Sequence, residues 1–213
     1  MTEVLLSGPC GRLEALYEAP DGDREPRGAA VVCHPHPLHG GTLQNTIVFR
    51  TARALRAEGF ATLRFNFRGV GESEGKYDGD GGEEGDVVAG LDWLEQRTPG
   101  VPLWAAGYSF GARTVCGTAQ RDRRIRRLVC VALPLRSLAC PGLESLTTPA
   151  FFLFGGIDEF GRLSDLKERL PAWPAHFDAV EIPEADHFFR RLTPKVEENV
   201  RAFAARSLEN RTP

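Results

Sequence analysis

Short apolar runs of strand type alternate with helix-like segments along most of this chain, starting at residue 29. The first run, Ala29–Cys33, is continuously apolar, which is typical of a strand covered on both faces. The sequence predicts strands at 29–33, 60–67, 101–106, 125–133, 149–154 and 177–182, and helices at 47–56, 83–97, from 112 onward, 162–170 and 194–208. Such alternation requires parallel strands joined by crossover helices, so we expect an α/β fold with a doubly wound, mostly parallel sheet and helices on both faces.

The segment before residue 29 predicts a different arrangement. Residues 11–19 alternate enough between apolar and polar side chains to form an antiparallel strand. The charged stretch 21–27 contains proline and glycine and predicts a hairpin-type connection to the strand at 29–33. Because no repeat or linker divides the chain and 42% of its residues are hydrophobic, we expect a single domain, residues 1–213, with one substantial core.

The charge balance excludes several classes of partner. The net charge is −3 and the pI is about 6.0, whereas nucleic acids and anionic membranes attract dense positive charge. The basic run 121–127 contains Asp122 and predicts a solvated connection. Residues 1–8 lack the basic start and apolar core of a signal peptide, and no segment is apolar for long enough to span a bilayer. We therefore expect no nucleic-acid or membrane partner.

The cysteines favour a reducing compartment. They are five in number and scattered, at positions 10, 33, 116, 130 and 140. Cys33 and Cys130 lie inside apolar runs, so the pattern predicts buried thiols. We therefore expect a cytoplasmic protein.

The pentapeptide Gly107–Gly111 joins the predicted strand at 101–106 to the helix that starts at residue 112. The glycines two residues either side of Ser109 remove the Cβ atoms that would clash in a tight strand-to-helix turn. In such a turn the serine takes a strained backbone conformation and exposes its Oγ, as a nucleophile requires. A serine is also a preferred helix N-cap, which is the alternative interpretation. The strand before it and the helix after it favour the nucleophile.

A serine nucleophile needs a base within hydrogen-bonding reach. Only His176 and His187 follow Ser109 in the chain. His176 leads into the strand at 177–182 and so lies at the wrong end of it. His187 follows that strand, at the carboxyl edge where Ser109 lies, and we expect it to be the base, although a surface loop histidine is the alternative.

The base in turn needs a carboxylate that orients it. Asp158 emerges from the carboxyl end of the strand at 149–154, after a glycine-rich turn that can place its short side chain behind the imidazole. Asp186 is less favoured, because adjacent residues rarely form a linear hydrogen bond with each other. We expect Asp158 to be the acid, with Glu159 as the fallback.

A serine nucleophile also requires an oxyanion hole made of two backbone N–H groups. Phe110, the residue after the nucleophile, supplies the first. The second is expected from the loop 34–41, in which the prolines at 35 and 37 have no N–H. His36 and Leu38 remain, and we favour His36.

Three other patterns indicate no cofactor or metal. The histidines at 34, 36 and 39 could be metal ligands, but no carboxylate or cysteine cluster accompanies them. The segment 69–74 begins like a dinucleotide-binding loop but has Glu74 where glycine is needed. The acidic stretch 72–84 lacks the spacing of a calcium-binding hand and predicts a solvated loop.

Together these motifs resemble the α/β-hydrolase superfamily. The resemblance rests on Gly107–Gly111, the His-Pro-His-Pro loop with Gly40 and Gly41, the segment 65–73, Asp158 and the run Asp186, His187, Phe188 and Phe189. Within the superfamily the chain is similar to small lid-less bacterial hydrolases related to dienelactone hydrolases and serine esterases. The resemblance implies a triad of Ser109, Asp158 and His187 without a cofactor. Dienelactone hydrolases use a cysteine where this chain has Ser109.

We therefore expect a serine hydrolase that cleaves carboxylic esters of small acyl groups through an acyl-enzyme intermediate. Amide, peptide or thioester hydrolysis on the same residues, or a non-catalytic binding module, are the alternatives, because this fold hosts many functions. The expected partner is a small-molecule substrate, and the sequence leaves the oligomeric state open.

No lid domain is expected, because the link at 135–148 between two core strands is too short to contain one. Side chains of the strand-end loops would then wall an open site. The candidates are Leu38, Tyr108, Leu135, Phe160 and Phe188. Each buried methylene contributes about 0.8 kcal/mol only where a pocket can bury it, so a shallow patch predicts a preference for short acyl groups.

Overall fold

The computed structural model describes residues 1–22, 24–79, 81–170 and 172–209. Its strands are β1 (Thr2–Gly8), β2 (Gly11–Glu18), β3 (Gly28–Cys33), β4 (Phe60–Phe65), β5 (Leu103–Tyr108), β6 (Ile125–Val131), β7 (Ala150–Gly155) and β8 (Phe177–Ile182). Its α-helices are α1 (Thr46–Ala57), α2 (Glu83–Arg97), α3 (Phe110–Arg121), α4 (Leu163–Arg169) and α5 (Thr193–Glu209). Two short 3-10 turns are η1 (Pro37–His39) and η2 (Leu143–Ser145).

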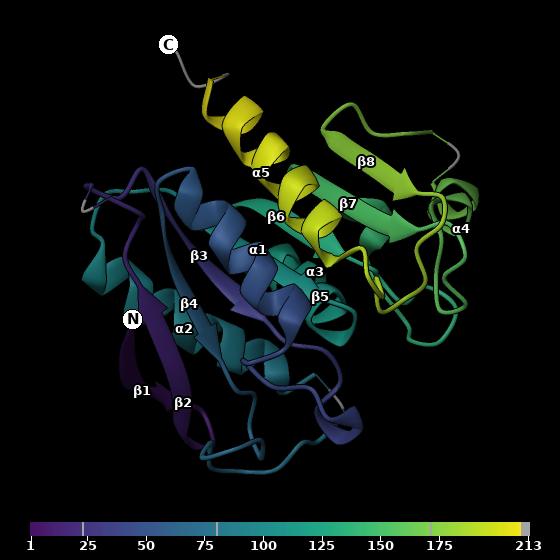
Figure 1. The fold of residues 1–213 in the computed structure, drawn as a ribbon. Coiled ribbons are helices and arrows are strands. Elements are labelled where there is room, and N and C mark those ends of the chain that lie inside the picture. Colours follow the sequence, from purple (N-terminus) through teal and green to yellow (C-terminus); the bar gives the residue numbers. More distant parts are fainter. Residues whose placement is uncertain (23, 80, 171, 210–213) are drawn as a thin grey trace.

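Within the described residues the strands form one sheet in the order β1-β2-β4-β3-β5-β6-β7-β8. The pairs from β4 to β8 are parallel, and β1–β2 and β2–β4 are antiparallel. Helices α1 and α5 lie side by side over one face of the sheet, and α2 and α3 lie over the other (Figure 1). The predicted α/β fold, with a doubly wound, mostly parallel sheet and helices on both faces, is confirmed.

Strand β3 shows why the central strands are apolar at every position. Ala29, Val31 and Cys33 belong to the core that α2 and α3 cover, whereas Ala30 and Val32 belong to the core that α1 and α5 cover. All five side chains are at most 1% exposed. Because both faces are buried, a polar residue at any of these positions would lose its contact with water.

The N-terminal strands are arranged differently from the prediction. β2 does not pair with β3, because β4 lies between them, antiparallel to β2 and parallel to β3. The hairpin connection predicted at 21–27, of which residue 23 lies outside the described residues, is therefore wrong. The hairpin partner of β2 is the edge strand β1, which the sequence analysis missed. β1 is buried on one side only, with Leu6 1% and Leu5 57% exposed, so its apolar pattern is weak.

The cysteines follow the prediction except at this hairpin. Cys33, Cys116, Cys130 and Cys140 are buried free thiols. Cys10, in the turn between β1 and β2, is exposed. The turn was not predicted, so nothing in the sequence separated Cys10 from the buried set.

The acidic stretch 72–84, of which residue 80 lies outside the described residues, departs from the predicted solvated loop only at its C-terminal end. Glu83 is 0% exposed at the start of α2, and burial raises the pKa of its carboxyl. Glu74 forms an ion pair with Arg12 of β2 at 2.7 Å. Glu72, Glu74 and Asp78 are exposed, so the predicted solvated loop is wrong only for Glu83, which begins α2.

The link between β6 and β7 is fastened to neighbouring helices through its backbone carbonyls. Arg113 Nε of α3 donates to Ala139 O at 3.1 Å. Gln120 Nε2 of the same helix donates to Pro141 O at 2.7 Å, and an Arg169 guanidinium nitrogen of α4 donates to Cys140 O at 2.8 Å. The link thus packs on α3 and α4, and no lid is inserted there. None of the described helices is long and apolar enough to cross a membrane.

Candidate active site

Ser109 lies in the turn between β5 and α3, at the carboxyl end of a central strand. Its backbone has φ 54° and ψ −114°, a conformation that costs a non-glycine residue about 1–3 kcal/mol. Two hydrogen bonds hold this conformation: Ser109 N–H donates to Val131 O of β6 at 2.9 Å, and Arg113 N–H donates to Ser109 O at 3.1 Å. The predicted strained strand-to-helix turn is therefore present.

The two glycines of the turn are required by close backbone approach. A Cβ on Gly107 would lie 2.2 Å from the carbonyl carbon of Gly111. A Cβ on Gly111 would lie 2.4 Å from Cys33 O at the end of β3. The Ser109 side chain makes no capping hydrogen bond to α3, so the interpretation as a helix cap is wrong.

Ser109, His187 and Asp158 form a continuous hydrogen-bonded chain. His187 Nε2 lies 3.0 Å from Ser109 Oγ, and His187 Nδ1 lies 2.7 Å from Asp158 Oδ2. Asp158 is 0% exposed, and its other oxygen accepts the Phe160 N–H at 2.7 Å. Because the carboxylate beside Nδ1 can only accept, Nδ1 carries the proton and Nε2 accepts from the serine hydroxyl. The arrangement can therefore withdraw a proton from Ser109 Oγ.

The rejected alternatives lie elsewhere. His176 Nε2 contacts Leu146 O at 3.0 Å, before β8 begins. Asp186 faces Arg190, with 2.7 Å between its Oδ2 and a guanidinium nitrogen. Glu159 is exposed. Geometry thus brings together the acid and base that the sequence analysis favoured, while their catalytic roles stay predictions.

Two further side chains hold the loops that carry these groups, and the sequence analysis missed both roles. Tyr108 was expected to line the pocket, but it is 4% exposed and its hydroxyl donates to His187 O at 3.1 Å. Burial raises the pKa of Tyr108, so the phenol keeps the proton that it donates. Arg162 Nε donates to Asp158 O at 2.9 Å. Tyr108 is therefore a support of the His187 loop in place of the predicted pocket wall.

The loop after β3 holds the candidate oxyanion donors. Leu38 N–H donates to His36 Nδ1 at 3.2 Å and so is already engaged. Among the described residues, no hydrogen bond uses the N–H of His36 or of Phe110, the first residue of α3. Of the two donors that the sequence left open, His36 therefore has the N–H that is available.

The rings of His36, Phe110 and Tyr77 pack together beside the two candidate N–H donors. The His36 and Phe110 rings lie 5.1 Å apart between centroids. Tyr77 packs on both, at 5.1 Å from His36 and 5.8 Å from Phe110, and its hydroxyl lies 3.3 Å from His36 Nε2. Sequence analysis could not find this contact, because Tyr77 belongs to a loop that is distant in the chain.

His34 holds the same loop through hydrogen bonds at both of its ring nitrogens. It is 0% exposed, its Nδ1 lies 2.6 Å from Pro35 O, and its Nε2 accepts the Phe67 N–H at 3.0 Å. Burial lowers the pKa of His34 to about 4, so the ring is neutral with its proton on Nδ1. Both ring nitrogens are used inside the protein, which removes His34 from any metal-ligand set. The described residues contain no group of three or more His, Cys, Asp or Glu side chains placed to hold a metal ion.

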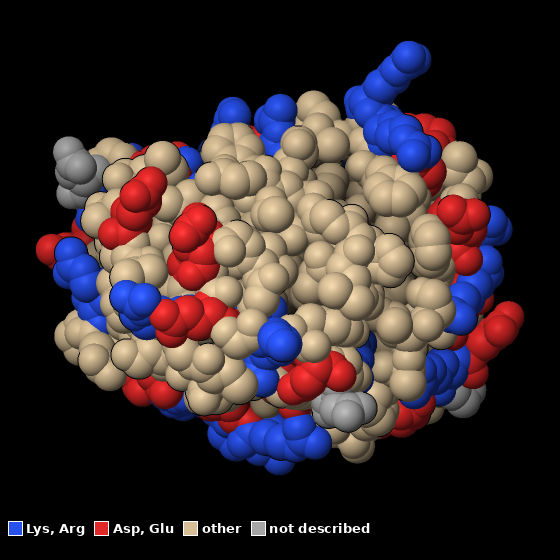
Figure 2. Space-filling model, turned by 90° about the horizontal axis from the view of Figure 1, so that it is seen from below, with Lys and Arg blue, Asp and Glu red and all other residues tan. Residues whose placement is uncertain are grey.

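The remaining pocket candidates are accessible to different degrees. Leu38 is 70% and Phe188 47% exposed, and Leu135 and Phe160 are half-buried. Figure 2 shows the face toward which the carboxyl ends of β3 and β4 point: a broad area without charged side chains, ringed by Lys, Arg, Asp and Glu. The middle of this face therefore presents no charged side chain to an approaching molecule.

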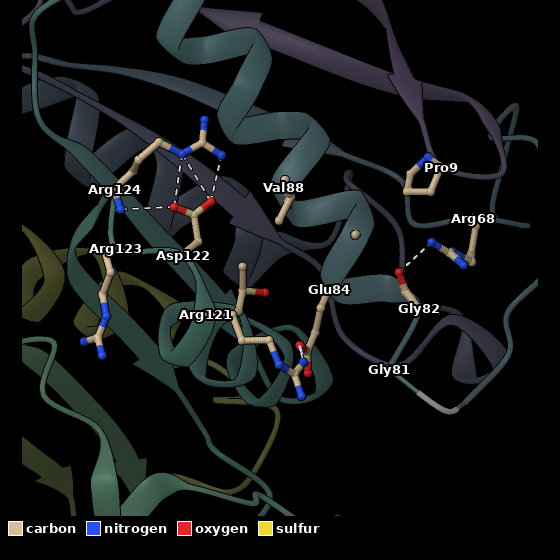
Figure 3. Close-up of a pocket in the computed structure, with 12 residues that line it drawn as sticks. Pro9, Arg68, Gly81, Gly82, Glu84, Val88, Arg121, Asp122, Arg123 and Arg124 are labelled. Carbon is tan, nitrogen blue, oxygen red and sulfur yellow. Dashed lines mark hydrogen bonds and ion pairs between the residues drawn. The ribbon is translucent and has the colours of Figure 1, made fainter.

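A separate cavity of about 790 Å³ lies between α2, α3 and the β1–β2 turn (Figure 3). None of the candidate site residues lines it. Its basic side chains are engaged: Arg121 pairs with Glu84, Arg124 pairs with Asp122, and Arg123 donates to Thr147. Arg121, Arg123 and Arg124 of the basic run thus have partners within the protein.

Comparisons with known proteins agree with this architecture. A family model described as alpha/beta hydrolase fold matches residues 38–152. An uncharacterized protein of Rickettsia prowazekii is 35% identical, over 91% of this chain and 84% of its own length.

Two solved structures with similar folds are described as an α/β serine hydrolase and a homologue of one. A Xanthomonas campestris protein described as an α/β serine hydrolase without lid is 30% identical, with a TM-score of 0.88 over 100% of this chain and 96% of its own. A Coxiella burnetii α/β serine hydrolase homologue is 35% identical, with a TM-score of 0.85 over 95% and 96%.

Proposed function

The chain belongs to the α/β-hydrolase family of serine hydrolases, and we propose that it cleaves carboxylic esters of small acyl groups through an acyl-enzyme intermediate. The observation that carries the proposal is the hydrogen-bonded chain from Ser109 Oγ through His187 to the buried Asp158. Those are the nucleophile, the base and the orienting acid that acyl transfer needs.

In the acylation half, Ser109 Oγ attacks the carbonyl carbon while its proton passes to His187 Nε2. The carbonyl π electrons move onto oxygen, which becomes an oxyanion. When the tetrahedral intermediate collapses, the bond to the alkoxy oxygen breaks and the proton on Nε2 moves to that oxygen, so an alcohol leaves. Asp158 stabilises the imidazolium that forms between these two proton transfers.

In the deacylation half, water gives its proton to His187 Nε2 as its oxygen bonds to the acyl carbon. The bond to Ser109 Oγ then breaks, Oγ recovers the proton from Nε2, and a carboxylic acid leaves. The N–H groups of Phe110 and His36 are the proposed donors to the oxyanion in both halves. Removing one such donor from a serine hydrolase costs on the order of 10²–10³-fold in rate.

The preference for small acyl groups follows from the absence of a lid over the site. The link between β6 and β7 is held on α3 and α4 by hydrogen bonds to its backbone carbonyls, and no lid domain is inserted in it. Leu38 and Phe188 stay partly in solvent, and a long acyl chain lying on them keeps much of its own surface wet. Each further methylene then collects only part of the roughly 0.8 kcal/mol that full burial provides.

A fluorophosphonate probe tests whether the serine is activated. We expect wild-type protein to be labelled at Ser109, and neither Ser109→Ala nor His187→Ala to be labelled. Absence of labelling in folded wild-type protein would favour a binding module. Matched ester, thioester and amide substrates of one acyl group then rank the three chemistries.

A p-nitrophenyl ester series from acetate to palmitate tests acyl size. We expect kcat/KM to peak between acetyl and butyryl, with no increase in rate when the substrate forms micelles. A maximum at long chains, or a jump at the micelle concentration, would contradict the open site.

A further inference from the structure

The aromatic rings beside His187 point to a second feature of the substrate. We propose that Phe188 is the binding platform for the leaving group and that it selects esters of aromatic alcohols. The inference rests on the proposed function, because it assumes that His187 protonates a leaving alcohol. It names the part of the substrate that the acyl preference leaves open.

The position of the leaving group follows from the proton transfer. The leaving oxygen must come within hydrogen-bonding reach of His187 Nε2, which lies 3.0 Å from Ser109 Oγ. The oxyanion points instead toward the N–H groups of His36 and Phe110. The body of the alcohol therefore extends along the His187 side of the site.

Three aromatic rings lie beside the imidazole. Their centroids lie 4.6 Å (Phe160), 5.4 Å (Phe188) and 5.6 Å (Tyr108) from that of His187. Tyr108 is buried beneath the loop and Phe160 is half-buried, whereas Phe188 is 47% exposed and perpendicular to the imidazole. Of the three rings beside the imidazole, Phe188 is therefore the one that offers the most exposed surface to a substrate.

Phe188 is also held in place, although it is exposed. The Arg190 guanidinium lies 4.7 Å from its ring centroid. Asp186 holds that guanidinium at 2.7 Å and accepts the Arg190 backbone N–H at 3.1 Å. The next residue, Phe189, is 0% exposed and anchors the loop in the core. A ring that is already fixed loses little conformational entropy when a ligand packs on it, which favours binding.

Aromatic pairs gain more than their buried area predicts, by an amount that corresponds to about 2- to 12-fold in kcat/KM. Buried area alone would favour the saturated ring, because a saturated ring of the same size is at least as apolar as an aromatic one. A preference for the flat ring over the saturated one is thus specific to an aromatic platform.

The test compares benzyl acetate with cyclohexylmethyl acetate. Both release a primary alcohol of similar size, so leaving-group chemistry and the acyl group are matched. We expect wild-type protein to have a kcat/KM about 2- to 12-fold higher for benzyl acetate. Phe188→Leu should lower this ratio to about one, and Phe188→Tyr, which keeps the ring, should retain it.

Phe49→Leu is the matched control. Phe49 is another exposed phenylalanine, with the Arg64 guanidinium 5.6 Å from its ring centroid, but it lies on α1. This variant should keep the wild-type ratio. Fluorophosphonate labelling of every variant at Ser109 checks that the site is assembled.

The outcomes separate this inference from the proposed function. A wild-type ratio of one or less, or a ratio unchanged in Phe188→Leu that is labelled normally, would overturn the platform while ester hydrolysis stands. A ratio lost only in Phe160→Leu would also overturn it, since the platform would be Phe160. No hydrolysis of either ester, nor of p-nitrophenyl acetate, would refute the proposed function itself.

Discussion

Replacing His34 by glutamine should remove a large part of the acid sensitivity of this protein. His34 accepts the Phe67 N–H through Nε2 and donates from Nδ1 to Pro35 O, so the folded protein has no place for a second proton on the ring. Burial lowers its pKa to about 4, against about 6.5 in an unfolded chain. A glutamine does not titrate and can still accept from the Phe67 N–H.

The sign and size of the effect follow from this pair of pKa values. Between pH 6.5 and pH 4 the unfolded chain binds more protons at His34 than the folded protein, so stability falls as the pH falls through this window. One proton between pKa values of 6.5 and about 4 changes the free energy of unfolding by about 2 kcal/mol between pH 8 and pH 5.

Urea unfolding at pH 8 and pH 5 measures this quantity in both proteins. Groups other than His34 titrate alike in wild type and His34→Gln, so the difference between their two pH dependences isolates His34. We expect wild-type protein to lose about 2 kcal/mol more than the variant on acidification. Equal losses would show that His34 titrates normally in the folded protein, which would refute the assignment of its two hydrogen bonds.

Two further predictions concern the proposed acid and the ring that packs beside the proposed oxyanion donors. Asp158→Asn should lower kcat on the order of 10³–10⁴-fold without unfolding the protein, while Glu159→Gln stays within about twofold of wild type; the reverse result would make Glu159 the acid. Tyr77→Ala should lower kcat about tenfold and change KM little, because the ring holds both oxyanion donors in place, and Tyr77→Phe should restore most of the rate. Steady-state kinetics with p-nitrophenyl acetate measures both, and a Tyr77→Ala effect on KM alone would show that the ring only contacts substrate.

Much of the fold was predictable because its signals are local. β3 is apolar at each position since helices cover both faces, and the glycines around Ser109 are dictated by backbone approach within a few residues. The candidate acid and base could be found from topology alone. Parallel strands place Asp158 and His187 at the edge where Ser109 lies, so chain order was sufficient.

The charged pairs could not be predicted in the same way. Asp86 of α2 is 0% exposed and pairs at 2.8 Å with Arg68, which lies in the loop after β4. Arg64 of β4 is buried at 2% exposure and pairs with Glu18 of β2 at 3.0 Å. Sequence analysis assigns a charged side chain to the surface unless its partner is known. Here the partner depends on the order of the strands in the sheet. The unexpected insertion of β4 beside β2 is what brings Arg64 and Glu18 together.

Tyr108 shows a second limit of sequence analysis, because the sequence alone does not indicate in which direction its side chain points. Sequence places Tyr108 next to Ser109, and a large aromatic residue beside a nucleophile predicts a wall for the substrate. In a strand, however, neighbouring side chains point to opposite faces, and the sharp turn at Ser109 leaves Tyr108 in the core that α1 and α5 cover. From there its hydroxyl reaches His187 O, so the residue that precedes Ser109 also holds the loop of His187. A buried phenol therefore supports the loop that places His187 Nε2 3.0 Å from Ser109 Oγ, in a chain whose β6–β7 link contains no lid.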